Sequence, residues 1–137
     1  MIAESGSKAT AGNVKVSGEY MTGASAYGDS TVHVKGNVTA DGDVTATGAN
    51  SVGIYGETGT IKIGGDVSGR EAVITKGKAD VTVGGFVSGT LVGIVAGGNA
   101  AVSVKGDAGT KTGAGMFAQE NATVTVDGNV TGGTFYG

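Results

Sequence analysis

Apolar residues recur along the chain as a short Val-x-Val element, in which two β-branched side chains flank one residue that is usually polar. Successive side chains of an extended strand point to opposite faces, so the flanking residues are predicted to enter a core and the middle residue to meet solvent. The flanking pairs are Val14/Val16, Val32/Val34, Ile61/Ile63, Val81/Val83, Val102/Val104 and Val124/Val126. The middle residues are Lys15, His33, Lys62, Thr82, Ser103 and Thr125.

Two further features accompany each Val-x-Val element at nearly fixed positions. A glycine comes two residues after the second apolar residue and another apolar residue two positions later, as at Gly65 and Val67. A pair of mostly apolar residues, such as Ile54-Tyr55, precedes the next element. Each repeat therefore contains three short extended segments separated by glycine-bearing or polar corners.

This repetition predicts an all-β fold, a right-handed parallel β-helix of about six coils with roughly 20–22 residues in each. The coils would stack about 4.8 Å apart and align equivalent residues in columns. Residues 13–137 are predicted to form the solenoid, with residues 1–12 as an N-terminal extension or cap. A near-duplication at about residues 36–50 predicts an enlarged second coil.

Two other folds remain as alternatives. Val32, Val38 and Val44 stand six residues apart, which is the spacing of a left-handed hexapeptide helix, although the pattern does not continue elsewhere. An antiparallel sandwich or barrel would also use short alternating strands, but equivalent segments one coil apart favour parallel stacking.

The composition agrees with a solenoid and narrows the function. The 29 glycines suit tight turns, and the absence of proline leaves every backbone N–H available to a hydrogen-bond ladder. No cysteine is present, which excludes disulfides and thiolate metal sites. The net charge is −3 and the lysines are scattered, so we expect no nucleic-acid partner. No apolar run is long enough for a transmembrane helix, so we expect no membrane insertion.

No group of residues indicates catalysis, so we expect no enzyme activity and no cofactor. Acid–base chemistry needs paired carboxylates on one face. The aspartates instead fall at three different positions of the repeat: after the glycine at Asp66 and Asp107, before the Val-x-Val element at Asp80, and after that element at Asp127. The single histidine, His33, lacks partners with metal-ligand spacing. Asp41 and Asp43 could hold calcium in the enlarged corner, but we expect them to be solvated, because calcium takes six to eight oxygen ligands.

The third segment of each repeat supplies the candidate interaction site. Both residues of its apolar pair cannot face the core of one strand. Tyrosine in a core would need a partner for its hydroxyl, so the tyrosine-bearing column is predicted to face outward, with Ile54, Val73, Ile94, Met116 and Phe135 inward. The outward column contains Tyr27, Tyr55, Ile74, Val95, Phe117 and Tyr136. We expect this stripe to contact protein, with a glycan as the alternative ligand, unless covering loops or a wider core bury both columns.

The ends of a solenoid present unpaired backbone groups. We therefore expect the chain either to be a piece of a longer array or to stack coil on coil as a filament subunit, with the piece favoured.

The repeat Val-x-Val-x-Gly-(Asp/Asn)-Val-(Thr/Ser)-Gly, followed by Gly-Ile-(Tyr/Val)-(Ala/Gly), resembles the glycine-rich repeats of bacterial cell-surface β-helix proteins. These include autotransporter passenger domains and surface adhesins, and the resemblance covers about residues 13–137. It implies a non-catalytic structural or adhesive segment that is extracellular or at the cell surface. A weaker similarity to bactofilin polymers implies a self-assembling filament subunit. A carbohydrate-binding module is the third possibility.

Overall fold

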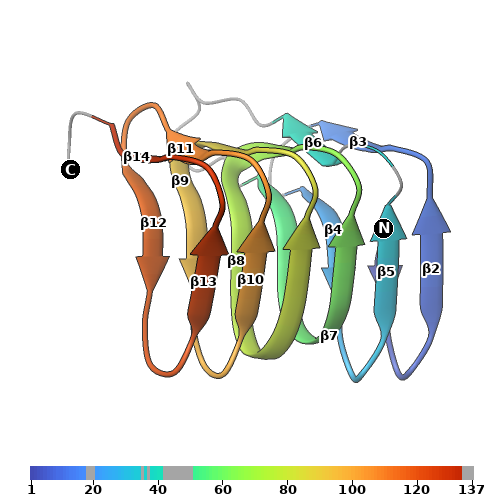
Figure 1. The fold of residues 1–137 in the computed structure, drawn as a ribbon. Helices are drawn as coiled ribbons and strands as arrows, with labels where there is room; N and C mark the ends of the chain where they lie inside the picture. The colour runs from blue at the N-terminus through green and yellow to red at the C-terminus, as the bar shows by residue number, and fades with distance from the viewer. Residues whose placement is uncertain (18–20, 35, 37, 42–50, 134–137) are drawn as a thin grey trace.

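The computed structural model describes residues 1–17, 21–34, 36, 38–41 and 51–133. These residues form parallel strands and turns without a helix, and they wind into a β-solenoid of about five turns. In Figure 1 the front strands rise, the chain crosses the top and descends at the rear, and successive coils lie farther to the left. This winding is right-handed. The predicted parallel β-helix is confirmed, with about five turns where the repeats predict six coils.

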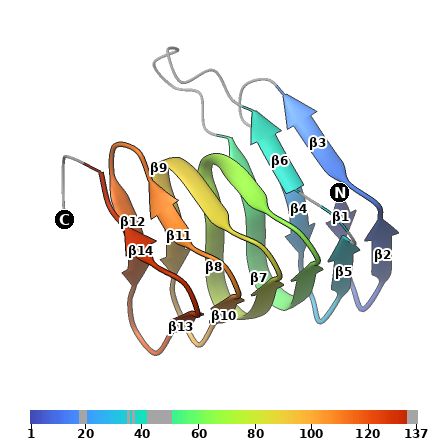
Figure 2. The same cartoon turned by 45° about the horizontal axis from the view of Figure 1, so that its top comes forward.

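Three columns of stacked parallel strands form the walls of the solenoid, named here as they lie in Figure 1. The front column contains β2 (Lys8–Ala11), β5 (Thr31–Val34), the ends of β7 (Val52–Ile63) and β8 (Val67–Val83), β10 (Ala101–Val104) and β13 (Thr123–Val126). The upper column, which comes forward in Figure 2, contains β3 (Val14–Ser17), β6 (Val38–Asp41), the starts of β8 and β9 (Val87–Ala96), β11 (Ala108–Thr110) and β14 (Val130–Thr131). The rear column contains β1 (Ile2–Ala3), β4 (Thr22–Ala26), the start of β7, the middle of β8, the end of β9 and β12 (Ala114–Ala118).

The core is a single apolar cluster that runs along the inside of all three columns. Register places Val32, Ile61, Val81, Val102 and Val124 directly over one another in the front column. The upper column contributes Val38, Val67, Val87 and Ala108, and the rear column contributes Ala24, Ile54, Val73 and Ile94. These rear and upper side chains are at most 2% exposed. β-Branched side chains dominate because their restricted rotamers fit a pleated wall.

The first repeat aligns differently from the prediction. Val14 pairs with Val38 in the upper column, whereas the partner of Val32 in the front column is Ala9. Thr10 therefore takes the place predicted for Lys15 beside His33. The front strand of this coil has Ala9 and Ala11 at its inward positions, and alanine is too small to give the Val-x-Val pattern. The pattern was therefore found in the following strand, at Val14 and Val16.

The predicted boundary at residue 13 is also too late. Within residues 1–12, β1 pairs with β4 and β2 pairs with β5, in the same parallel manner as the later coils. This segment is a rung of the solenoid rather than an extension added to it. The enlarged second coil predicted at about 36–50, with Asp43, falls mostly outside the described residues.

Glycine is required at the corner between the upper and rear columns. A Cβ on Gly53 would meet the Ala72 carbonyl oxygen at 2.5 Å and the Val67 side chain at 2.9 Å. The corner at the bottom of Figure 1 instead needs left-handed backbone, at Gly77 (φ 62°) and Gly98 (φ 72°). There the side-chain amide of Asn121 donates to that of Asn99 at 3.2 Å, which ties neighbouring coils together.

Candidate interaction surface

The predicted stripe is a continuous row over four successive coils of the rear column. Tyr55 pairs with Ile74, Ile74 with Val95, and Val95 with Phe117. We call these four residues the rear ladder. The first three are half-buried and Phe117 is 51% exposed. Their neighbours Ile54, Val73 and Ile94 are 0% exposed, so the predicted inward and outward assignment is confirmed at these positions.

Met116 was predicted to face inward but is 38% exposed. It stands on β12, which pairs with β9 on one side and with no described strand on the other. Without a rung on that side, an inward side chain retains solvent contact. Tyr136 and Phe135 lie outside the described residues.

Tyr27 does not stand in the row where the sequence placed it. The residue opposite Tyr55 is Ser25, and Tyr27 follows the end of β4. Its ring nevertheless lies 5.9 Å from the ring of Tyr55, at an interplanar angle of 38°. The segment around Ser25 consists of small residues that give no apolar alternation, so its register could not be fixed from the pattern. Tyr27 remains part of the same surface through its contact with Tyr55.

Sequence reasoning missed Ile2 as a member of this surface. Ile2 pairs with Ser25 and is 63% exposed. Its pairing puts it in the same row as the rear ladder, one coil beyond Ser25. Ile2 aligns through Ser25 with Tyr55, so the sequence signal is the apolar pair Met1-Ile2, which holds the place of Ile54-Tyr55 in the register.

A second row beside the rear ladder is also mainly apolar. Val52 pairs with Glu71, Glu71 with Val92 and Val92 with Ala114, and all four are half-buried. Glu71 is the charged member of this row. The outer surface of the rear column therefore combines two rows in which apolar side chains predominate.

The front column has the same interior but a polar exterior. One outward row contains Thr10, His33, Lys62, Thr82, Ser103 and Thr125, and the other contains Lys8, Thr31, Thr60, Asp80, Ala101 and Thr123. His33 is flanked by Thr10 and Lys62, and neither residue is a metal ligand in this row. This face offers hydroxyl groups and charges but no apolar row.

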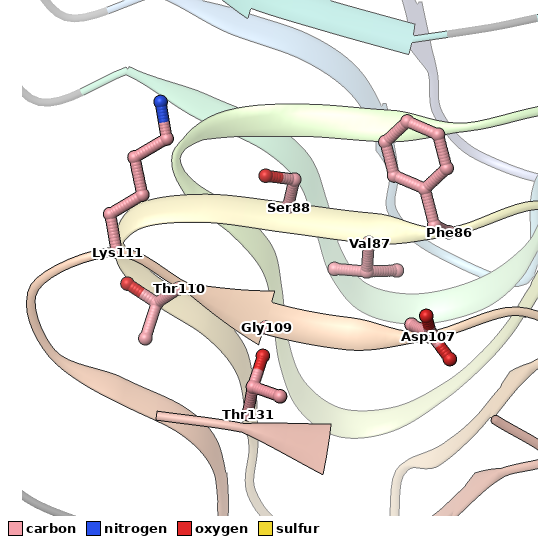
Figure 3. A pocket seen from close by; sticks show the side chains of 8 residues that line it. All are labelled: Phe86, Val87, Ser88, Asp107, Gly109, Thr110, Lys111 and Thr131. Atoms are coloured by element: carbon pink, nitrogen blue, oxygen red, sulfur yellow. The ribbon is translucent and has the colours of Figure 1, made fainter. Parts of the chain in front are cut away.

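A shallow groove on the upper column, with a volume of about 350 Å³, was not foreseen from the sequence (Figure 3). Its lining residues are Phe86, Val87, Ser88, Asp107, Gly109, Thr110, Lys111 and Thr131. Phe86 occupies the middle position of the Gly-(Asp/Asn)-Val motif, and its aromatic side chain is 48% exposed. The sequence signal was therefore Gly85-Phe86-Val87, where the repeat otherwise has a short polar residue.

Asp66 and Asp107 share the corner that leads into the upper column, but each accepts a backbone N–H from the next coil rather than facing the other carboxylate. Within the described ranges, no three or more histidine or acidic side chains come together as a possible metal site. The same residues include no helix long and apolar enough to cross a membrane. The side chains of Asp41 and Asp43 are not described, so the calcium alternative lies outside the structure.

Comparison with known proteins gives no relative: no protein-family model matches the chain, and no curated protein or solved structure matches it significantly. The similarity to surface β-helix repeats rests on the repeat residues alone.

Proposed function

We propose that the chain is a non-catalytic structural or adhesive segment of a bacterial surface protein, and that the rear ladder is its protein-contact surface. The observation that carries this proposal is the register that aligns Tyr55, Ile74, Val95 and Phe117 in one outward row. Soluble proteins rarely expose a contiguous apolar surface that has no binding role. The extracellular or cell-surface location is supported by the resemblance of the repeats to those of bacterial surface proteins.

A second copy of the chain is the partner that fits this surface. Side chains in the rear ladder repeat at the spacing of the rungs, about 4.8 Å. A second solenoid has the same spacing, so two rear columns can pack row against row, as stacked sheets do at about 10 Å. Identical surfaces that meet in this way form an isologous dimer, the commonest symmetric assembly.

The chemistry of the surface agrees with such a contact. Fully burying one large apolar side chain is worth about 1.5–3 kcal/mol, and Phe117 and Ile2 both have much of their surface left to bury. Val52, Val92 and Ala114 add apolar area beside the ladder, while Glu71 is the carboxylate that would have to stay hydrated at the edge.

Sedimentation velocity over a concentration series tests the proposal. The unmodified chain is expected to form dimers, and the double variant Tyr55→Ser/Phe117→Ser is expected to stay monomeric. A matched control is Lys62→Ser/Thr125→Ser, which changes outward residues of the front column in the corresponding coils and should dimerise like the unmodified chain. A chain that is monomeric at every concentration, or a control that loses association equally, would contradict the proposal.

Coil-on-coil stacking into a filament is a second candidate, favoured by the terminal rungs. Within the described part of the chain, β2 pairs with β5 alone and β13 with β10 alone, so each has an edge with unpaired backbone groups. Val124 and Val126 on β13 are half-buried although they face the interior. Such an edge can accept another strand. Negative-stain microscopy distinguishes the candidates, because stacking gives fibres and contact between rear columns gives closed pairs.

A further inference from the structure

The corner before the upper column follows a simple hydrogen-bond rule. Asp66 Oδ1 accepts the backbone N–H of Phe86 at 3.0 Å, and Asp107 Oδ1 accepts the backbone N–H of Asn129 at 2.7 Å. A short polar side chain here therefore binds the equivalent residue of the next coil.

Phe86 breaks this rule without changing the backbone. Its carbonyl accepts the N–H of Val67 at 2.9 Å, and the Asp107 carbonyl accepts the N–H of Val87 at 2.9 Å, so the coil continues through this corner unaltered. The phenyl side chain cannot accept the hydrogen bond that an aspartate or asparagine would accept from the next coil. It also gains little from packing, since it is 48% exposed. A residue that departs from a local structural rule without a structural gain indicates a functional site.

The groove beside Phe86 owes its shape to a missing side chain. The outward row of the upper column runs through Ser68, Ser88, Gly109 and Thr131. Gly109 leaves a notch between Ser88 and Thr131, and a Cβ on Gly109 would collide with the Thr131 hydroxyl. Figure 3 shows Phe86 and Lys111 toward opposite ends of this groove, with Ser88 between them.

Several polar groups in the groove are available to a ligand. Two groups already have partners within the protein: the Thr110 hydroxyl donates to the Thr90 carbonyl at 3.0 Å, and Asp107 Oδ1 accepts the backbone N–H of Asn129. By contrast, the Ser88 and Thr131 hydroxyls and the Lys111 ammonium have no hydrogen-bond or ion-pair partner among the described residues. The groove thus presents one aromatic ring beside the Asp107 carboxylate at one end, two hydroxyl groups, and the unpaired positive charge of Lys111 at the other end.

We propose that this groove binds an acidic oligosaccharide. The C–H face of a sugar ring is weakly positive and packs on the negative face of an aromatic ring, which Phe86 supplies. Ser88 and Thr131 bind sugar hydroxyls, and Lys111 pairs with a carboxylate or sulfate on the ligand. The volume of about 350 Å³ lies at the small end of ligand sites, which suits a short saccharide segment.

The register sets the length of the ligand. Val87 pairs with Ala108, so Phe86 stands beside Asp107 and four positions before Lys111. At about 3.3 Å per residue of extended strand, the backbone positions of Phe86 and Lys111 are separated along the strands by about 13 Å. That distance exceeds one sugar ring, so the charged unit is a neighbour of the unit that stacks on Phe86. The site lies on the upper column and does not depend on association through the rear ladder.

Isothermal titration calorimetry with a short oligogalacturonate, and with a neutral galactose oligomer of the same length, tests the site. The acidic oligomer is expected to bind at least tenfold more tightly than the neutral one. Phe86→Asn is the informative variant, because asparagine can restore the corner hydrogen bond while it removes the ring. It should lose at least tenfold in affinity while its melting temperature stays the same or rises.

Two further variants separate the parts of the proposal. Lys111→Gln should weaken binding of the acidic oligomer about tenfold and leave the neutral oligomer unaffected. Phe117→Asn removes an exposed aromatic residue from the rear column and should bind like the unmodified chain, even if its sedimentation changes. Equal binding of the two oligomers, no binding of either, or unchanged binding by Phe86→Asn would each overturn the proposal.

Discussion

The front and rear columns are alike inside and opposite outside. Ile61 and Val81 face the core from the front column, and Ile54 and Val73 face it from the rear, all at 0% exposure. Outside, the front rows are rich in threonine, serine and charged residues, whereas the rear ladder is Tyr55, Ile74, Val95 and Phe117. Strand pairing is parallel in both columns.

The difference teaches that a wall strand of the coil needs apolar residues only in its inner row. A strand needs one apolar row against the core, and its other row is not constrained by the fold. The front column shows that polar side chains satisfy the outer row. The apolar outer row of the rear column is therefore not required for folding, which is why we assign it a contact role.

The largest effect is expected from the inner rows, where the two columns should respond alike. Ile61→Ala in the front column and Ile94→Ala in the rear column each remove a fully buried side chain. Each should lower the free energy of unfolding by about 2–5 kcal/mol, from lost burial and the cavity that remains. Urea unfolding followed by circular dichroism measures this, and a column that tolerates the change would show that it is not part of one core.

A smaller effect is expected from the outer rows, where the columns should differ. Tyr55→Ser removes the ring that lies 5.9 Å from Tyr27, and an aromatic pair contributes about 0.5–1.5 kcal/mol beyond the area it buries. Thr82→Ser in the front column should change the free energy of unfolding by less than about 0.5 kcal/mol. Both are measured at a concentration where the chain is monomeric. Equal losses would mean that the rear ladder matters to the fold as much as to association.

The smallest effect is expected from the ion pair after the front column. Lys105 Nζ lies 2.9 Å from Asp127 Oδ2, with the two side chains 62% and 47% exposed. Exposed ion pairs are worth about 0–1 kcal/mol. Lys105→Ala should therefore shift the melting temperature by only a few degrees, and 1 M salt should remove most of the difference from the unmodified chain. A large, salt-resistant loss would give this corner a structural role that its exposure does not suggest.

Large β-branched residues made most of the fold predictable. From Val32 onward, the predicted alignment of the Val-x-Val pairs is the alignment found in the structure. The need of a tyrosine hydroxyl for a polar partner also predicted correctly that Tyr55 faces outward and Ile54 inward. The register of strands with small residues could not be predicted in this way. Ala9 pairs with Val32 and Ser25 with Tyr55, but neither small residue contributes to an apolar periodicity.

The groove at Phe86 required the structure for a different reason. The departure of Gly85-Phe86-Val87 from the repeat is visible in the sequence. Its meaning is not visible there, because the notch at Gly109 and the hydroxyls of Ser88 and Thr131 come from three different coils. Only the register brings these side chains beside one exposed ring.

Cysteine cross-linking tests the central claim most directly, because the chain contains no cysteine that would interfere. Ile74→Cys and Val95→Cys place a thiol in the rear ladder, and Thr82→Cys and Ser103→Cys place one at the middle of the outer front row. Under mild oxidation the two rear variants should form disulfide-linked dimers and the two front variants should remain monomers. Dimers from the front variants in equal yield, or none from the rear variants, would contradict the assignment of the rear column as the contact surface.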